Sequence, residues 1–278
     1  MATPSDSVGK TRESMDVLGV TPARHLAATF DRDDANLTSG ARLPCGWTLL
    51  YFLDCPPTSL IGRDGRTTPG EFIPDTGLPR RMWAGGSFTF ERDLVLGRPA
   101  RQTVTITSVE RKKGRSGDLC FVTTEHRIAQ EDGDAVIEVR NLVFRDEPGV
   151  SGEARRVAPP QEAAWQRSVV ADPVLLFRFS ALTFNAHRIH YDVEYCRNEE
   201  AYPDLVVHGP MQALLLLDLA ERTFPERRIR HFRYRGTAPL FAPHPFLVCG
   251  KPEAGGDLRL WIEDSSGGLT TSAELEFA

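Results

Sequence analysis

Apolar and polar residues alternate along several segments of the chain, and this alternation predicts β-strands. The clearest case is the segment 135–145, in which Ile137 and Val139 alternate with Glu138 and Arg140. Successive side chains of a strand point to opposite faces of a sheet, so this pattern indicates a strand with one buried face. Seven further segments have strand-like patterns: 87–95, 102–110, 119–129, 228–237, 246–251, 257–263 and 269–277.

Two apolar segments predict helices, one in each half of the chain. The segment 210–224 is apolar nearly all round before Asp218, which is typical of a helix buried on most sides. The shorter run GWTLLYFLD, at 46–54, predicts a second helix. Each predicted helix is followed by four predicted strands. This repeated order, a helix and then a run of antiparallel strands, predicts an α+β fold with two similar halves.

The distribution of proline, glycine and polar residues predicts the boundaries of these halves. Residues 1–20 are polar, and we expect them to be frayed. Residues 146–166 contain several prolines and glycines with few bulky apolar residues, which indicates a linker. The predicted halves are therefore 21–145 and 167–278.

The composition excludes several classes of function. The chain has 278 residues and a formal net charge of −5, which argues against a nucleic-acid partner, because such a partner requires a basic face. No apolar run reaches the roughly 18 residues of a membrane-spanning helix. Asp6 and Glu13 and the lack of an early apolar run disfavour a secretory signal and weaken a mitochondrial transit signal. The five cysteines are scattered without a C-x-x-C pair, so we expect no disulfide framework or zinc site and a cytoplasmic location.

The candidate chemistry lies in FSALTFNAHRIHYD, at 179–192, and in VVHGP, at 206–210. His190 can transfer a proton near neutral pH, because the ordinary pKa of histidine is about 6.5. Asn185 can hold a water or a hydroxyl through its donor and its acceptor together. Gly209, at the start of the predicted apolar helix, can present a backbone N–H to a developing negative oxygen. These three groups suit the addition of water to an acyl thioester, or its removal.

The first of these stretches resembles the signature of the MaoC-like, or hydratase 2 type, enoyl-CoA hydratases, which is roughly F-x-x-L-[ST]-G-D-x-N-P-[IL]-H. Five positions match it: Phe179, Leu182, Thr183, Ile189 and His190. Among the positions that depart from it, Phe184 replaces the glycine, Asn185 the catalytic aspartate and Arg188 the proline.

An asparagine at the aspartate position resembles one subgroup, which comprises the type 2 hydroxyacyl-thioester dehydratases and the mesaconyl-C4-CoA and itaconyl-CoA hydratases. The segments 80–90, 94–128 and 236–250 resemble this subgroup as well. The resemblance implies a double hotdog, in which two antiparallel sheets each wrap a central helix, and a homodimer of such chains. It also implies a C5 dicarboxylic acyl group. Only the second half carries the motif, so we expect the first half to be a degenerate partner that supplies a wall of the site.

Six basic residues are candidates for substrate contacts: Arg178, Arg188, Arg233, Arg235, Lys113 and Arg115. The first two flank the motif and are candidates for binding an acidic acyl group. The others are candidates for the phosphates or carboxylate of the ligand, and the alternative for each is a solvated strand or a charged hairpin turn. His187 and His208 are interpreted as structural, with His208 bonded to a backbone or turn group.

The leading hypothesis is thus a hydratase or dehydratase of a coenzyme A thioester. It requires no metal or redox cofactor, because coenzyme A is part of the substrate. One alternative is a 3-hydroxyacyl-thioester dehydratase of fatty-acid metabolism. A second is a hotdog thioesterase, which Asn185 disfavours because an amide cannot act as the base. A third is an acyl-CoA binding protein without activity, in which Asn185 marks a dead site.

Overall fold

The computed structural model describes residues 3–70, 72–114, 117–131, 133–146, 157–160 and 162–278. Its strands are β1 (Thr11–Val17), β2 (Arg80–Phe90), β3 (Pro99–Gly114), β4 (Gly117–Ala129), β5 (Asp134–Arg145), β6 (Trp165–Val170), β7 (Ile229–Gly236), β8 (Pro245–Pro252), β9 (Leu258–Glu263) and β10 (Leu269–Phe277). Its α-helices are α1 (Val20–Thr29), α2 (Pro173–Leu182), α3 (Val193–Asn198) and α4 (Gly209–Thr223). Short 3-10 turns cover Pro4–Ser7, Trp47–Leu50, Thr58–Leu60, Arg188–His190 and Ala254–Gly256. Within these parts of the chain, no helix is long and apolar enough to cross a membrane.

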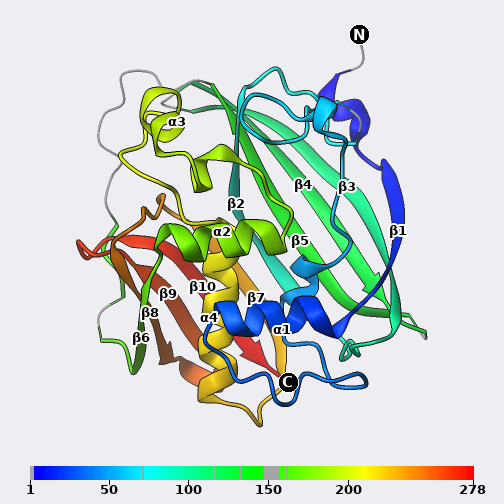
Figure 1. The fold of residues 1–278 in the computed structure, drawn as a ribbon, viewed down its shortest axis with the longest axis vertical. Coiled ribbons are helices and arrows are strands. Elements are labelled where there is room, and N and C mark those ends of the chain that lie inside the picture. The colour runs from blue at the N-terminus through cyan, green and yellow to red at the C-terminus, as the bar shows by residue number, and fades with distance from the viewer. Residues whose placement is uncertain (1–2, 71, 115–116, 132, 147–156, 161) are drawn as a thin grey trace.

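The strands form one antiparallel sheet in the order β1-β3-β4-β5-β2-β7-β10-β9-β8-β6 (Figure 1). The two halves meet where β2 pairs with β7, with Gly85 opposite Arg235 and Thr89 opposite His231. The two sheets of the predicted double hotdog are therefore joined edge to edge into a continuous surface. All eight predicted strands are present, with ends shifted by up to seven residues, the most at β2, which was predicted at 87–95.

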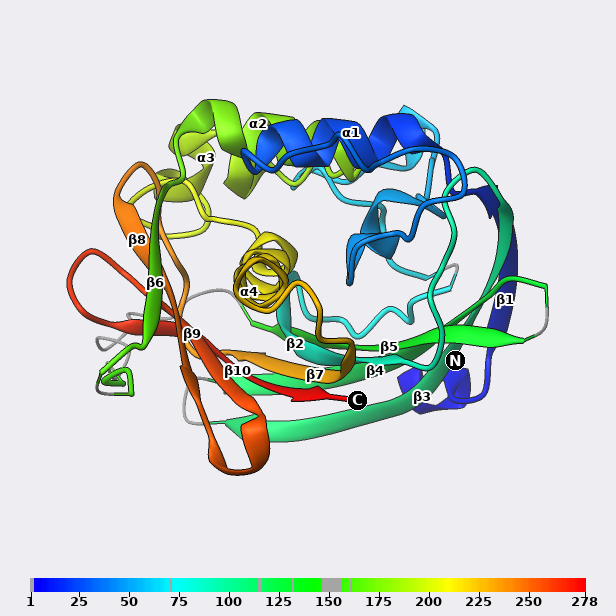
Figure 2. The ribbon, with the colours of Figure 1, turned by 90° about the horizontal axis from the view of Figure 1, so that it is seen from below.

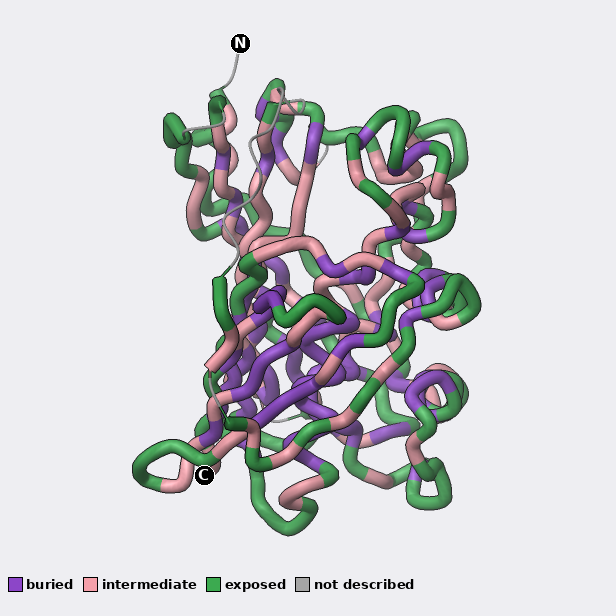
Figure 3. Tube along the Cα trace, turned by 90° about the vertical axis from the view of Figure 1, so that its left-hand side faces the viewer, coloured by how far each residue is buried: buried purple, intermediate pink, exposed green. Residues whose placement is uncertain are grey.

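Helix α4 is the central helix of the second half. It lies between the sheet and a layer formed by α1 and α2 (Figure 2), and the side chains of its middle turns are buried. Buried residues are concentrated on the inner strands and on this helix, whereas the loops at the ends of the molecule are exposed (Figure 3). The all-round apolar pattern of 210–224 is thus explained by contacts on every side of the helix.

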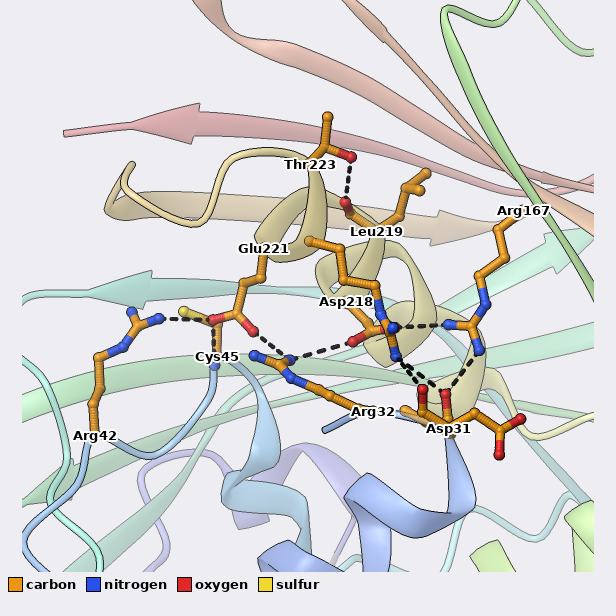
Figure 4. Close-up of polar contacts among 11 residues, drawn as sticks. Asp31, Arg32, Arg42, Cys45, Arg167, Asp218, Leu219, Glu221 and Thr223 are labelled. Atoms are coloured by element: carbon orange, nitrogen blue, oxygen red, sulfur yellow. Dashed lines mark hydrogen bonds and ion pairs between the residues drawn. The ribbon is translucent and has the colours of Figure 1, made fainter. Parts of the chain in front are cut away.

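A cluster of ion pairs fixes the C-terminal end of α4 to both halves (Figure 4). Asp218 accepts hydrogen bonds from three arginines: Arg32 at 3.3 Å, Arg167 at 2.8 Å and Arg222 at 2.7 Å. Glu221 binds Arg32 at 2.7 Å and Arg42 at 3.1 Å. Because both carboxylates are buried, each would be a strongly destabilising unpaired charge without its arginine partners. The cluster therefore holds the segment before β2 against α4.

The expectation that residues 1–20 are frayed is wrong for 11–17. These residues form β1, which pairs with β3 from Thr11 opposite Thr105 to Val17 opposite Pro99. Most side chains of β1 are exposed, so the strand shows no apolar alternation and only its backbone bonds reveal it. At the other boundary, residues 165–166 of the predicted linker belong to β6, while 147–156 and 161 lie outside the described residues.

The predicted helix at 46–54 is also wrong, because only one 3-10 turn forms, at Trp47–Leu50. Gly46 before the turn and Phe52 after it have left-handed backbone conformations, with φ of 77° and 56°. A side chain at Gly46 would collide with Leu214 and Leu217 of α4, so the chain approaches that helix closely here. In the described residues, no long helix then fills the concave face of β2–β5, and this face lines a cleft.

Candidate active site

A cleft of about 2060 Å³ separates the concave face of β2–β5 from the start of α4 and from the motif loop, the part of 179–192 that follows α2. Its wall in the first half includes Arg81 and Trp83 of β2 and Arg140 of β5. Asn185, His190 and Gly209, the three residues predicted to act on the thioester, all line it from the second half. The structure therefore brings the predicted catalytic groups together and faces them with the first half.

His190 ends the short turn Arg188–His190 and is buried. Its Nδ1 lies 2.7 Å from the carbonyl oxygen of Val206. A carbonyl can only accept, so Nδ1 carries the proton and Nε2 has a free lone pair. Burial, assisted by the charge of Arg66, lowers the pKa of His190 to about 4, although the bond to Val206 opposes the shift. The ring is thus neutral at pH 7, the form in which it can act as a base.

His208 holds the plane of the His190 ring. The two rings are stacked with centroids 3.6 Å apart and planes 19° apart. Nε2 of His208 lies 2.9 Å from the Ser180 hydroxyl, and Phe179 contacts its ring with centroids 4.9 Å apart. The interpretation that His208 bonds a backbone or turn group is wrong, because its partner is a side chain of α2. Burial holds the pKa of His208 well below its usual range, so the stack carries no positive charge at neutral pH.

Asn185 follows α2 in a tight turn. Its N–H donates to the carbonyl of Ser180 at 2.8 Å, and its Oδ1 accepts from the N–H of His187 at 3.1 Å. These bonds leave the Nδ2 amide as the group available to a ligand. The His187 ring in turn meets the His190 ring edge to face, with centroids 5.4 Å apart.

The turn before Asn185 explains one departure from the family signature. Phe184 has a φ of 48°, a left-handed conformation that glycine adopts at little cost and phenylalanine does not. The signature has glycine at this position. The Phe184 side chain is 60% exposed and lines the cleft.

Gly209 is the first residue of α4, where a helix provides no backbone partner for the N–H. A Cβ at Gly209 would lie 3.3 Å from Cβ of Trp83, tighter than ordinary packing. Trp83 is itself fixed by a hydrogen bond of 2.7 Å from its Nε1 to the Tyr234 hydroxyl. Glycine is therefore needed for the close approach of the two halves, and its N–H stays compatible with the predicted role.

A loop of the first half, Gly62–Arg66, supports the motif loop and was not singled out from the sequence. The carbonyl of Asp64 accepts from the N–H of Arg188 at 2.8 Å. Gly65 packs so closely that a side chain there would overlap the carbonyl of Ala186. Arg66 projects toward the cleft, bonded to Asp64 at 2.6 Å and to the carbonyl of Arg81 at 2.5 Å.

Comparison with known proteins agrees with this geometry. The sequence model of hydroxyacyl-thioester dehydratase type 2 matches residues 46–242. The chain belongs to this family. It is 42% identical to the mesaconyl-C4-CoA hydratase of Chloroflexus aurantiacus, with 97% of this chain and 96% of that protein covered. It is 28% identical to the mitochondrial type 2 hydroxyacyl-thioester dehydratase of Schizosaccharomyces pombe, with 90% and 89% covered. Both relatives are named in the predicted enzyme class.

Solved structures that are similar to this chain confirm the predicted fold. A MaoC-like dehydratase from Phytophthora capsici has a TM-score of 0.68 and 15% identity, with 100% of this chain and 98% of that chain covered. A Mycobacterium tuberculosis protein with a double hotdog fold has a TM-score of 0.62 and 13% identity, with 97% and 96% covered. The fold class is therefore that of the double hotdog.

The basic residues that were predicted to bind substrate and that the structure describes do not line the cleft. Arg188 pairs with Asp192 at 2.6 Å and lies over the Tyr195 ring at 4.4 Å, so its charge is already used within the motif loop. Arg178, on α2, is exposed and does not line the cleft. The geometry therefore does not support an acyl-binding role for these two arginines.

The remaining three described candidates, Arg233, Arg235 and Lys113, are exposed on β7 and at the end of β3, outside the cleft. Arg115 lies outside the described residues. Contacts of these four with coenzyme A stay predictions. Among the cations that do line the cleft are Arg66 and Arg81. Neither was a candidate from the sequence, although Arg81 lies in the segment 80–90 that resembles the subgroup.

Proposed function

We propose that the protein is a hydratase that adds water to mesaconyl-C4-CoA, or to the isomeric itaconyl-CoA, and forms citramalyl-CoA. The observation that carries the proposal is the neutral His190 ring, with its Nε2 free in the same cleft as the Asn185 amide and Gly209. The 42% identity to a mesaconyl-C4-CoA hydratase over nearly the whole chain supports the choice of acyl group.

In the proposed reaction on mesaconyl-C4-CoA, whose double bond is conjugated with the thioester, Asn185 and His190 hold one water against the β-carbon. His190 Nε2 takes a proton as the water oxygen bonds to the β-carbon, and the thioester oxygen becomes an enolate oxygen. The imidazolium then returns the proton to the α-carbon, which completes the addition. Proton transfer of this kind contributes roughly 10²–10⁴-fold in rate.

The enolate oxygen needs a donor, and we assign this role to the backbone N–H of Gly209. Loss of one such donor typically costs about 3–4 kcal/mol of transition-state stabilisation. No step requires a metal or a redox cofactor, and coenzyme A enters as part of the substrate. We place the reaction in the cytoplasm, because the five cysteines are free thiols that suit a reducing compartment.

The relation to type 2 hydroxyacyl-thioester dehydratases favours a second candidate, the dehydration of a 3-hydroxyacyl thioester. The same three groups would act in reverse. The acyl group separates the candidates, because a fatty-acid enzyme must accept an apolar chain without a carboxylate.

Product analysis tests the proposal. Incubation with mesaconyl-C4-CoA should consume the enoyl thioester and yield citramalyl-CoA by mass spectrometry, with no free thiol in a thiol assay. Release of free coenzyme A would instead indicate a thioesterase. Binding of several enoyl-CoAs without turnover would indicate a binding protein and contradict the proposal.

A further inference from the structure

The arginines of the cleft differ in whether a carboxylate neutralises them. Among the described residues, six arginines line the cleft. Four of them have a carboxylate partner: Arg12 with Asp54 at 2.8 Å, Arg66 with Asp64 at 2.5 Å, Arg80 with Glu200 at 2.6 Å and Arg140 with Glu138 at 2.7 Å. The other two, Arg81 and Arg145, form no ion pair or side-chain hydrogen bond with any residue that the structure describes.

Arg81 is the cation without an ion pair on the strand that faces the start of α4. It is on the cleft side of β2, opposite Phe144 and two residues before Trp83. Arg81 and Trp83 both line the cleft, and Trp83 packs against Gly209 at the start of α4. Burial is the largest cause that lowers the pKa of His187, and the charges of Arg66 and Arg81 add to it, whereas Arg145 does not contribute.

The Arg81 guanidinium stays charged in this environment. Burial and the charge of Arg66 lower its pKa to about 10, while the charges of Asp64 and Asp54 oppose the shift, and the group stays protonated at neutral pH. Arg81 is half-buried and has no ion pair, so an anion that binds beside it gains a charge-assisted hydrogen bond. The hydrogen bond from Arg66 to the Arg81 carbonyl fixes the backbone at this point. The position is therefore prepared for an anionic ligand.

The chemistry of the proposed substrate places its anion here. In mesaconyl-C4-CoA the carboxylate is attached to the β-carbon, the same carbon that receives the water. Its recognition site must consequently adjoin His190, which excludes exposed residues such as Arg178. We propose that Arg81 binds this carboxylate and selects the dicarboxylic acyl group, an inference that rests on the proposed function. Arginine suits the task, because its planar donors match a carboxylate in a bidentate manner.

Two unreactive thioesters test this assignment without any turnover. Methylsuccinyl-CoA, with its thioester at C4, and isovaleryl-CoA have the same carbon skeleton and differ in that a carboxylate replaces a methyl group. Isothermal titration calorimetry should show that the native protein binds the carboxylate form more tightly. Arg81→Gln should reduce that preference by at least about tenfold, the usual worth of a charge-assisted hydrogen bond, with little change for isovaleryl-CoA.

Arg145→Gln is the matched control, because it removes an unpaired arginine from the same cleft, and it should keep the binding ratio of the native protein. Arg81→Lys, checked for folding by circular dichroism, provides a second variant if the glutamine variant does not fold, and it should lose part of the preference. Equal weakening of both analogues by Arg81→Gln would show that Arg81 holds coenzyme A and would overturn the proposal. An unchanged ratio, or a native protein without preference, would also overturn it. Failure to hydrate mesaconyl-C4-CoA, measured separately, would refute the function and not this contact.

Discussion

The His190 ring is held in place before any substrate arrives. Val206 fixes its tautomer, His208 covers one face and His187 contacts it edge to face. Such preorganisation is what a general base requires, since the geometry must already be correct when the proton moves.

Removal of this base should abolish most of the activity. His190→Ala should reduce turnover of the enoyl-CoA substrate by at least about 100-fold, because proton transfer by a positioned base contributes that much or more. Circular dichroism would confirm that the variant folds. His25→Ala, an exposed histidine on α1, is the control and should retain activity. Near-normal turnover in a folded His190→Ala protein would remove His190 from the mechanism.

Asn185 should tolerate aspartate better than alanine. Asn185→Ala loses both the oxygen that accepts from His187 and the amide that faces the ligand, so turnover should be severely impaired. Asn185→Asp keeps the accepting oxygen in a nearly isosteric side chain, and it should keep measurable activity. Steady-state kinetics of both variants decide the matter. An active alanine variant beside an inactive, folded aspartate variant would contradict the role given to this position.

For single residues, the sequence predicts the catalytic groups that belong to a motif. It misses the residues whose role depends on what surrounds them in the folded chain. His190, Asn185 and Gly209 follow from residue type and spacing. Arg81 does not, because its importance lies in its place on the cleft wall without an ion-pair partner, which only the folded chain reveals. Arg188 was overestimated for the converse reason, since Asp192 already neutralises it.

Among the elements, α4 and the strands with one buried face could be predicted, because burial imposes a period on their side chains. The edge strand β1 could not, since exposed side chains carry no such period. The run at 46–54 failed for a different reason: a short apolar run does not distinguish a helix from a buried turn. Here the left-handed residues Gly46 and Phe52 on either side limit it to one turn.

The buried histidines on the elements around the cleft make the free energy of unfolding depend on pH. Burial lowers the pKa values of His126, His187, His190 and His208, in the case of His190 to about 4. The unfolded chain takes up protons on these rings near pH 6.5, whereas the folded chain does not until much lower pH. The free energy of unfolding should therefore fall as the pH falls from 7 to 5, by up to ~2 kcal/mol from His190 alone.

Urea denaturation at pH 7 and at pH 5 measures this effect. The His190→Gln variant provides the control, because it lacks one of the four rings and should lose less stability over the same interval. A denaturation midpoint that does not change between the two pH values would contradict the account of the buried rings.

For the whole molecule, the resemblance to hotdog proteins predicts a homodimer. The sheet ends in two free edges, β1 and β6, and free edges are where sheets add strands. Residues on and next to these edges include exposed apolar side chains, such as Met15 and Val17 on β1 and Val174 close after β6. Light scattering at micromolar concentration should give the mass of two chains, and a mass of one chain would show that the prediction is wrong.

The cleft lies between the two halves of the molecule. The central claim is that, in this cleft, the enzyme hydrates an enoyl-CoA with a carboxylate on its acyl group. The most direct measurement is kcat/KM for mesaconyl-C4-CoA and for crotonyl-CoA under identical conditions. A charge-assisted hydrogen bond to the carboxylate should favour mesaconyl-C4-CoA by at least about tenfold. Equal or better use of crotonyl-CoA, or of a long-chain enoyl-CoA, would contradict this account and would indicate a dehydratase of fatty-acid metabolism.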